Sequence, residues 1–154
     1  MFQQWDESEA EKIIAGFGEL DGALLPILHA VQERFGYIPD AATPLIAKEL
    51  NLSRAEVHGV VSFYHDFRTA PPPRLVVKVC RAEACQAVGA RQAAQALLTN
   101  LGLDWDQPAS DQSVVVEPVY CLGLCALAPA AMIGEDLVSG LDGAELIKAV
   151  NAAL

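Results

Sequence analysis

Four cysteines are the residues of this chain whose spacing could support chemistry. Cys80 and Cys85 form one pair with four residues between them, and Cys121 and Cys125 form a second pair with three residues between them. The pairs are 35 residues apart, so only folding can bring the four sulfurs together. Four thiolates at one place can hold a tetrahedral metal ion such as zinc or an iron–sulfur cluster, and disulfide bonds are the third possibility.

Each cysteine pair follows a run of residues typical of a buried β-strand. Residues 75–79 read Leu-Val-Val-Lys-Val and lead into Cys80, and residues 114–119 read Val-Val-Val-Glu-Pro-Val and end two residues before Cys121. Neighbouring strands lie only about 4.8 Å apart. If these two strands are parallel and adjacent, their carboxyl ends deliver Cys80 and Cys121 side by side, and the following loops return the second cysteine of each pair.

The spacing within the pairs separates the three kinds of site. Structural zinc sites and redox dithiols usually have two residues between paired cysteines, whereas the gaps here are four and three. Wider loops suit four sulfurs that surround two irons and two sulfides, and plant-type ferredoxins also begin with a four-residue gap. Both loops are rich in Ala, Gly and Leu, which lets backbone N–H groups approach sulfur and keeps water away. The spacing favours a 2Fe-2S cluster and leaves zinc and disulfides as alternatives.

Composition and charge exclude several functional classes. The chain has 154 residues, 53% of them hydrophobic and 19% charged, which is enough for a buried core. Its 20 acidic and 10 basic residues give a net charge of −10, the wrong sign for binding nucleic acid or an anionic membrane. No apolar run reaches the ~20 residues of a membrane span. Four acidic residues between positions 6 and 11 stand where a signal peptide would be basic, so we expect a cytoplasmic protein, in which disulfides are uncommon.

The first 73 residues are predicted to form an N-terminal helical bundle. Apolar periodicity and capping signals indicate four helices, over residues 9–17, 23–35, 43–50 and 53–64. Capping boxes are expected at Ser8 with Glu11 and at Ser53 with Glu56. Three consecutive prolines, at positions 71–73, form a stiff extended segment that we take as the domain boundary.

Residues 74–154 are predicted to form a second domain with alternating strands and helices. The expected elements are strands at 75–79, 114–119, 131–133 and 137–139, and helices at 87–101 and 143–153. A βαβ unit followed by a hairpin and a helix is the element order of a thioredoxin-like domain. The expected fold class is therefore mixed, α+β or α/β, with a helical bundle preceding a thioredoxin-like 2Fe-2S ferredoxin domain.

Some residues of the helical region suggest functions that the rest of the sequence does not support. His29, His58 and His65 could ligate a metal but lie far in sequence from the cysteines, so solvent, core or partner contacts are the favoured roles. The aromatic run 63–67 could be a docking surface or could pack between the domains. Residues 44–64 read like a helix-turn-helix, so a zinc-binding transcription regulator is the rival function, which the acidic charge argues against.

Together these motifs resemble the thioredoxin-like 2Fe-2S subunit of NADH dehydrogenases, the 24-kDa-type subunit of respiratory complex I. The resemblance covers about residues 10–154. It is carried by the two cysteine pairs with Leu-Gly-Leu between the last two, by Gly89 and Ala128-Pro129, and by residues 25–28, 35–39 and 59–64. Arg81 and Glu83 depart from the small or hydroxyl residues that the family commonly has in the first loop.

The resemblance implies one 2Fe-2S cluster with Cys80, Cys85, Cys121 and Cys125 as its ligands, near the FMN of a partner flavoprotein subunit. The chain would be a non-catalytic electron carrier. Because it has no glycine-rich dinucleotide loop, FMN and NAD are expected on that partner. The same subunit type occurs in NADH:quinone oxidoreductase and NAD-reducing hydrogenases. The chain is most similar to the gamma subunit of soluble NAD-dependent formate dehydrogenases, which implies a larger molybdenum-containing, formate-oxidising subunit as a further partner.

Overall fold

The structure is a computed structural model that describes residues 4–154. The chain divides into two compact units, Met1–Pro72 and Pro73–Leu154. The expected boundary, after residue 73, lies one residue from this division, and the first three residues of the expected helical domain lie outside the described part. Each unit has its own hydrophobic core, so the two are described separately.

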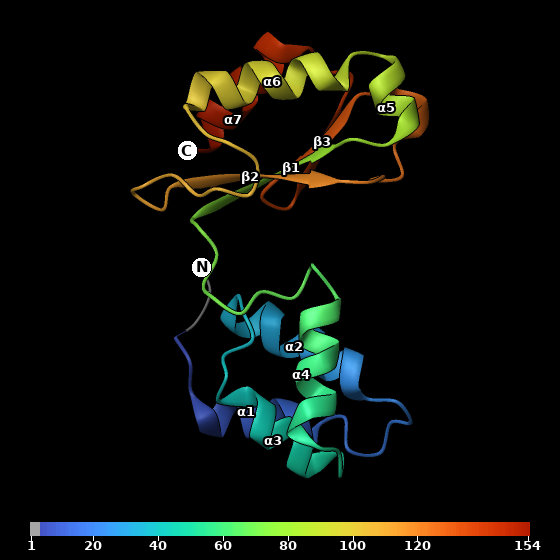
Figure 1. The fold of residues 1–154 in the computed structure, drawn as a ribbon, viewed down its shortest axis with the longest axis vertical. Helices are drawn as coiled ribbons and strands as arrows, with labels where there is room; N and C mark the ends of the chain where they lie inside the picture. Colours follow the sequence, from blue (N-terminus) through green and yellow to red (C-terminus); the bar gives the residue numbers. More distant parts are fainter. Residues whose placement is uncertain (1–3) are drawn as a thin grey trace. The chain divides into compact units, whose positions relative to one another are not determined.

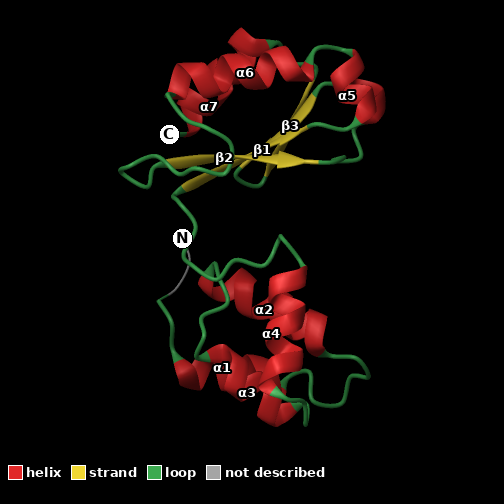
Figure 2. Cartoon of the chain, in the orientation of Figure 1, coloured by secondary structure: helices red, strands yellow, loops and turns green. Residues whose placement is uncertain are grey.

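Residues 4–72, the described part of the first unit, form four helices, which are labelled in Figure 1 and coloured red in Figure 2. They are α1 (Glu7–Ala15), α2 (Leu24–Phe35), α3 (Ala42–Glu49) and α4 (Arg54–Phe63). Each helix contributes buried apolar side chains to one shared core, which also includes Ile38 and Phe67 from the connecting segments. All three histidines are exposed, and the centroid of the His29 imidazole ring lies 5.0 Å from the centroid of the Phe67 ring. The four helices are therefore held together by apolar burial.

The helix starts confirm one predicted cap and correct another. At α4, Ser53 and Glu56 form the expected reciprocal capping box, and the bonds from the Ser53 backbone and side chain lower the pKa of the Glu56 carboxyl. The capping box predicted at Ser8 is wrong. Helix α1 starts earlier, because the Asp6 side chain accepts a hydrogen bond from the Glu9 N–H at 2.9 Å and places Ser8 inside the first turn.

The second unit has a four-stranded sheet with helices α6 and α7 on one face (Figure 1). In chain order its elements are β1 (Leu75–Cys80), α5 (Glu83–Ala87), α6 (Ala90–Leu101), β2 (Val114–Val119), the 3₁₀ turn η1 (Cys125–Leu127), β3 (Ala130–Ile133), β4 (Asp136–Ser139) and α7 (Gly143–Ala153). The strand order is β2-β1-β3-β4, with β1 and β2 parallel and the other pairs antiparallel. This mixed sheet agrees with the predicted strands.

The helix expected over residues 87–101 starts three residues later in the structure, at Ala90, and a short helix that the sequence did not predict precedes it. This helix, α5, begins at Glu83, and Gly89 separates it from α6. Gly89 has a φ of 97°, a left-handed conformation that glycine adopts without the strain of a Cβ atom. The break lets the segment after Cys80 form a separate short helix over the end of the sheet, where it carries Cys85.

Helix α7 approaches α6 closely because its first residue is a glycine. A Cβ atom on Gly143 would lie 3.0 Å from the Cβ of Ala96 and 3.5 Å from the Cα of Ala93. The start of α7 is fixed by Asp142, whose carboxylate accepts hydrogen bonds from the N–H groups of Ala144 and Glu145.

Every helix within residues 4–154 is too short or too polar to span a membrane.

Candidate metal centre

The first cysteine pair is buried where β1 ends. Cys80 is the last residue of β1 and is 1% exposed, and Cys85 on α5 is 2% exposed. The Cys85 thiol hydrogen-bonds to the Cys80 sulfur. The strand and the short helix therefore hold two sulfurs together inside the protein, as the sequence predicted for one pair of the site.

The second pair follows β2 and is exposed to solvent. The Sγ atoms of Cys121 and Cys125 lie 3.5 Å apart, and the Gly123 N–H donates to the Cys121 sulfur at 3.4 Å. Cys121 has a φ of 100°, which is rare for a residue with a side chain and often marks a functional constraint. The loop therefore turns sharply at Cys121 and brings Cys125 back to it.

The parallel pairing of β1 and β2 brings the two cysteine pairs together. Cys80 is the register partner of Val119, so Cys121 lies two residues beyond the paired ends of the strands. The backbone N–H groups of Cys121 and Leu122 hydrogen-bond to the Cys80 sulfur. The thiol of Cys125 interacts electrostatically with those of Cys80 and Cys85. The structure thus places all four predicted residues at one edge of the sheet.

Backbone N–H groups point at three of the four sulfurs. Cys80 accepts from Ala82 as well as from Cys121 and Leu122, Cys85 accepts from Ala130, and Cys121 accepts from Gly123. Such donors stabilise thiolates and are one of the means by which proteins set the potential of iron–sulfur clusters. The loops of small residues therefore bring amide donors to the sulfurs, as their composition suggested.

The thiols differ in how readily they lose a proton. Burial raises the pKa of Cys80, but hydrogen bonds from the Ala82 N–H, the Cys85 thiol and two further N–H groups outweigh it and lower the pKa overall. The pKa of Cys85 is raised by burial and by its bond to Cys80, and that of Cys125 is raised mainly by its bond to Cys121. A bound metal ion would displace the protons of the thiols that ligate it.

The sulfurs of the second pair are spaced as two ligands of one metal ion would be. In the part of the chain that the structure describes, no group of three or more Cys, His, Asp or Glu side chains is arranged as a metal-binding group. The 3.5 Å separation in the second pair is close to the about 3.8 Å expected for two thiolates at 2.3 Å from one tetrahedral ion. It is also far longer than the about 2.05 Å of a disulfide bond. Two adjacent pairs match the ligands of a two-iron cluster.

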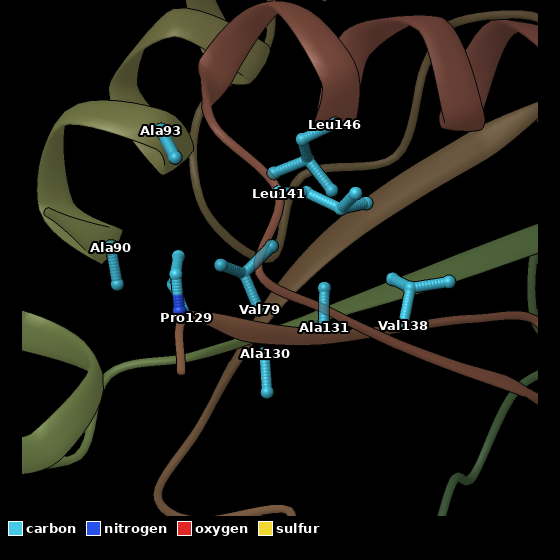
Figure 3. A pocket seen from close by; sticks show the side chains of 9 residues that line it. All are labelled: Val79, Ala90, Ala93, Pro129, Ala130, Ala131, Val138, Leu141 and Leu146. Carbon is cyan, nitrogen blue, oxygen red and sulfur yellow. The ribbon is translucent and has the colours of Figure 1, made fainter. Parts of the chain in front are cut away.

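Apolar side chains surround the sulfurs. Buried Ala90 and Ala130 contact the first pair, and five partly buried residues pack against this group: Ala82, Val119, Leu122, Leu124 and Ala128. An apolar cavity of about 10 Å³ lies beside it and shares Ala90 and Ala130 in its lining (Figure 3). That volume is close to one water molecule, so the cavity is no cofactor site. The surroundings keep water away from the first pair.

Two residues near the cysteines have contacts that the sequence did not indicate. Gln86 directly follows Cys85, and its side-chain Nε2 donates to the Arg81 carbonyl oxygen at 3.3 Å. The guanidinium of Arg81 lies over the ring of Trp105, 5.2 Å from the ring centroid. Gln86 could have been considered from its position beside a cysteine. The partner of Arg81, 24 positions further along the chain, had no local signal.

Several known proteins are similar to this chain. It is 31% identical over 140 residues to the NADP-reducing hydrogenase subunit HndA of Solidesulfovibrio fructosivorans, covering 91% of this chain and 82% of HndA. It is 34% identical over 127 residues to an NADH-quinone oxidoreductase subunit of Mycobacterium tuberculosis, covering 82% of this chain but only half of that protein. The corresponding protein of Pseudomonas aeruginosa is 29% identical over 136 residues, covering 88% of this chain and 82% of that protein.

The fold and the sequence profile point to the same family. An NAD⁺-reducing [NiFe]-hydrogenase structure in the air-oxidized state matches 85% of this chain and 22% of its own chain, with a TM-score of 0.73 and 24% identity, which supports the fold. The profile of the thioredoxin-like [2Fe-2S] ferredoxins matches residues 10–153 and so includes both cysteine pairs. Since that match spans nearly the whole sequence, the chain belongs to the thioredoxin-like [2Fe-2S] ferredoxin family.

Proposed function

We propose that Cys80, Cys85, Cys121 and Cys125 hold one 2Fe-2S cluster. The observation that carries the proposal is the meeting of two thiol pairs at one sheet edge, with backbone N–H groups directed at the sulfurs. When bound, a 2Fe-2S cluster supplies reversible one-electron oxidation and reduction. The chain's own residues provide four thiolates, stabilise their negative charge through amide donors and exclude water with small apolar side chains.

The chain acts as an electron-transfer subunit of an NAD-linked complex. Its relatives are named as subunits of an NADP-reducing hydrogenase and of NADH-quinone oxidoreductases, which supports this role. Cys121 and Cys125 are exposed, so the outer side of the site is accessible to a partner protein. That partner is a flavoprotein subunit that binds FMN and NAD and exchanges electrons with this chain, which itself makes and breaks no bonds in the substrate.

The parent complex is a soluble NAD-dependent formate dehydrogenase with a molybdenum-containing, formate-oxidising subunit. This assignment rests on the overall sequence resemblance alone, since the relatives named above belong to hydrogenase and quinone-linked complexes. Purification of the affinity-tagged chain from its native cells under mild conditions tests this assignment. A large molybdenum subunit among the co-purified chains supports a formate dehydrogenase. A nickel–iron pair would instead indicate a hydrogenase, and membrane subunits would indicate a quinone-linked complex.

Phe63→Ala is expected to weaken binding of the flavoprotein subunit. Phe63 ends α4 with 73% of its surface exposed, and its ring lies edge-on to that of Tyr64 with 5.1 Å between the ring centroids. Aromatic residues are enriched at interface cores, and truncating a residue that dominates the binding energy costs about 2 kcal/mol or more, roughly a thirtyfold loss in affinity. Titration of the flavoprotein subunit against both proteins measures the change.

Leu20→Ala is the matched control for that titration. Leu20 is also a large apolar residue of the first unit, with 50% of its surface exposed, but it lies outside the aromatic run 63–67. We expect the Leu20 variant to bind like the unaltered chain. Equal affinity of the Phe63 variant and the unaltered chain would remove Phe63 from the docking surface.

A further inference from the structure

The peptide unit between Arg81 and Ala82 is held at both of its ends. Its N–H group, on Ala82, acts on the Cys80 sulfur and lowers the pKa of that thiol. Its carbonyl oxygen, on Arg81, accepts from the Gln86 side-chain Nε2 at 3.3 Å. Because a trans peptide is planar, its C=O and N–H point in opposite directions and rotate together. A side chain that fixes the carbonyl therefore also fixes the direction of the N–H toward the sulfur.

The backbone of Gln86 is hydrogen-bonded to the same loop that its side chain contacts. Its backbone N–H donates to the Ala82 carbonyl at 3.0 Å, as part of α5. Its side chain thus reaches back across a loop to which its backbone is already bonded. Both bonds act on the segment between Cys80 and Cys85, so they restrict the same short stretch of backbone.

The side-chain amide of Gln86 makes one hydrogen bond but leaves its other polar atom without a partner. Its Oε1 atom is buried and has no hydrogen-bond partner among residues 4–154. A buried acceptor without a partner is unfavourable, and an apolar side chain of similar length would avoid it. Turning the amide over would place Oε1 against the Arg81 carbonyl oxygen, two acceptors with no proton between them. The amide orientation is therefore determined, and its useful contribution is the Nε2–H donor.

We infer that Gln86 is a positioning residue that raises the reduction potential at this site through the Arg81–Ala82 peptide. The inference rests on the proposed 2Fe-2S cluster. Reduction adds negative charge near the sulfurs, so an N–H donor directed at Cys80 favours the reduced state more than the oxidised state. The bond from Gln86 also polarises the peptide, which strengthens its N–H as a donor. Loss of that bond should lower the potential.

The test is a redox titration of the full chain carrying its cluster, unaltered and as Gln86→Met. Methionine has a similar length and no donor, so we expect full cluster content and a lower midpoint potential. At a fixed potential, the ratio of reduced to oxidised protein should fall about threefold, which is about 28 mV at 59 mV per tenfold change for one electron. Pulsed electron paramagnetic resonance should also show a weaker coupling to the exchangeable Ala82 amide proton.

Gln95→Met is the matched control. Gln95 lies on α6 with its side chain exposed, and its amide bonds only to the Thr99 hydroxyl among the described side-chain contacts. The same substitution there should leave the potential and the proton coupling unchanged. An equal shift in the Gln95 variant would show that the effect is not specific to the Arg81–Ala82 peptide, and would overturn the inference.

The outcomes separate this inference from the proposed function. A Gln86→Met protein with a full cluster and an unchanged potential overturns the inference and leaves the 2Fe-2S assignment standing. Absence of a 2Fe-2S spectrum from the unaltered chain overturns the assignment itself. If Gln86→Met binds no cluster, the midpoint potential of Gln86→Glu is measured instead. Glutamate keeps the side-chain shape, and the inference predicts that it also lowers the potential. Loss of the cluster from both variants would assign Gln86 a purely structural role and contradict the inference.

Discussion

Cys121→Ser is expected to remove the visible absorption of the 2Fe-2S cluster and to leave residues 73–154 poorly folded. Substitution of residues that merely orient metal ligands typically costs about 10–100-fold in metal affinity, so loss of one of four proposed ligands should cost more than that range. Cys121 also accepts the Gly123 N–H, and the shorter serine side chain would weaken that contact in addition to removing the proposed metal bond. Iron and sulfide analysis, with circular dichroism of the same sample, measures both effects.

Tyr120→Phe is the control for the cysteine substitution. Tyr120 immediately precedes Cys121, has 72% of its surface exposed, and keeps its ring in the variant. It should bind a full complement of iron and sulfide. A Cys121→Ser protein with a native cluster spectrum would mean that Cys121 is not a ligand, and the proposed set of four would have to be revised.

Phe35→Ala should destabilise the helical unit without affecting the metal centre. Phe35 is 2% exposed, ends α2, and contacts the ring of Trp5 at a centroid distance of 4.9 Å. Truncating a buried phenylalanine to alanine typically costs about 3–5 kcal/mol, a large part of the about 5–15 kcal/mol that stabilises an ordinary domain. Because the second unit has a separate core, the 2Fe-2S absorption should persist at denaturant concentrations that unfold the helices.

This prediction also tests our proposal that residues 1–73 and 74–154 are separate domains. Denaturant unfolding followed at once by far-ultraviolet circular dichroism and by visible absorption distinguishes the two transitions. Phe63→Ala is the control, since an exposed phenylalanine of the same helical unit should change its stability by less than about 0.5 kcal/mol. Coincident loss of both signals in Phe35→Ala would show one cooperative unit.

The sequence predicted that the four cysteines lie together because two strong local signals coincide there. Valine-rich runs at 75–79 and 114–119 indicated strands, and parallel pairing necessarily brings their ends to one edge of the sheet. The capping box at Ser53 was equally predictable, since its hydrogen bonds join residues only three positions apart. Patterns that depend on near neighbours or on strand pairing were therefore recovered.

Other features could not be predicted from the sequence because they depend on competition between nearby capping residues or on contacts between residues far apart in the chain. Asp6 and Ser8 are both good helix caps, and only the packed helix α1 decides for Asp6. The short helix α5 has too few residues for a periodic signal, so the sequence predicted only the helix after it, and placed the start of that helix at Ala87 instead of Ala90. The amide donors to the Cys80 sulfur come partly from the loop after β2, which only the fold places there.

The central claim is that the four cysteines hold two irons bridged by sulfide. Anaerobic purification of the full chain, followed by analysis of iron, sulfide and zinc and by electron paramagnetic resonance after dithionite reduction, tests it most directly. We predict a coloured protein with two irons and two acid-labile sulfides per chain and the resonance of one unpaired electron after reduction. A colourless protein that contains zinc in place of iron and gives no resonance after dithionite would contradict the account.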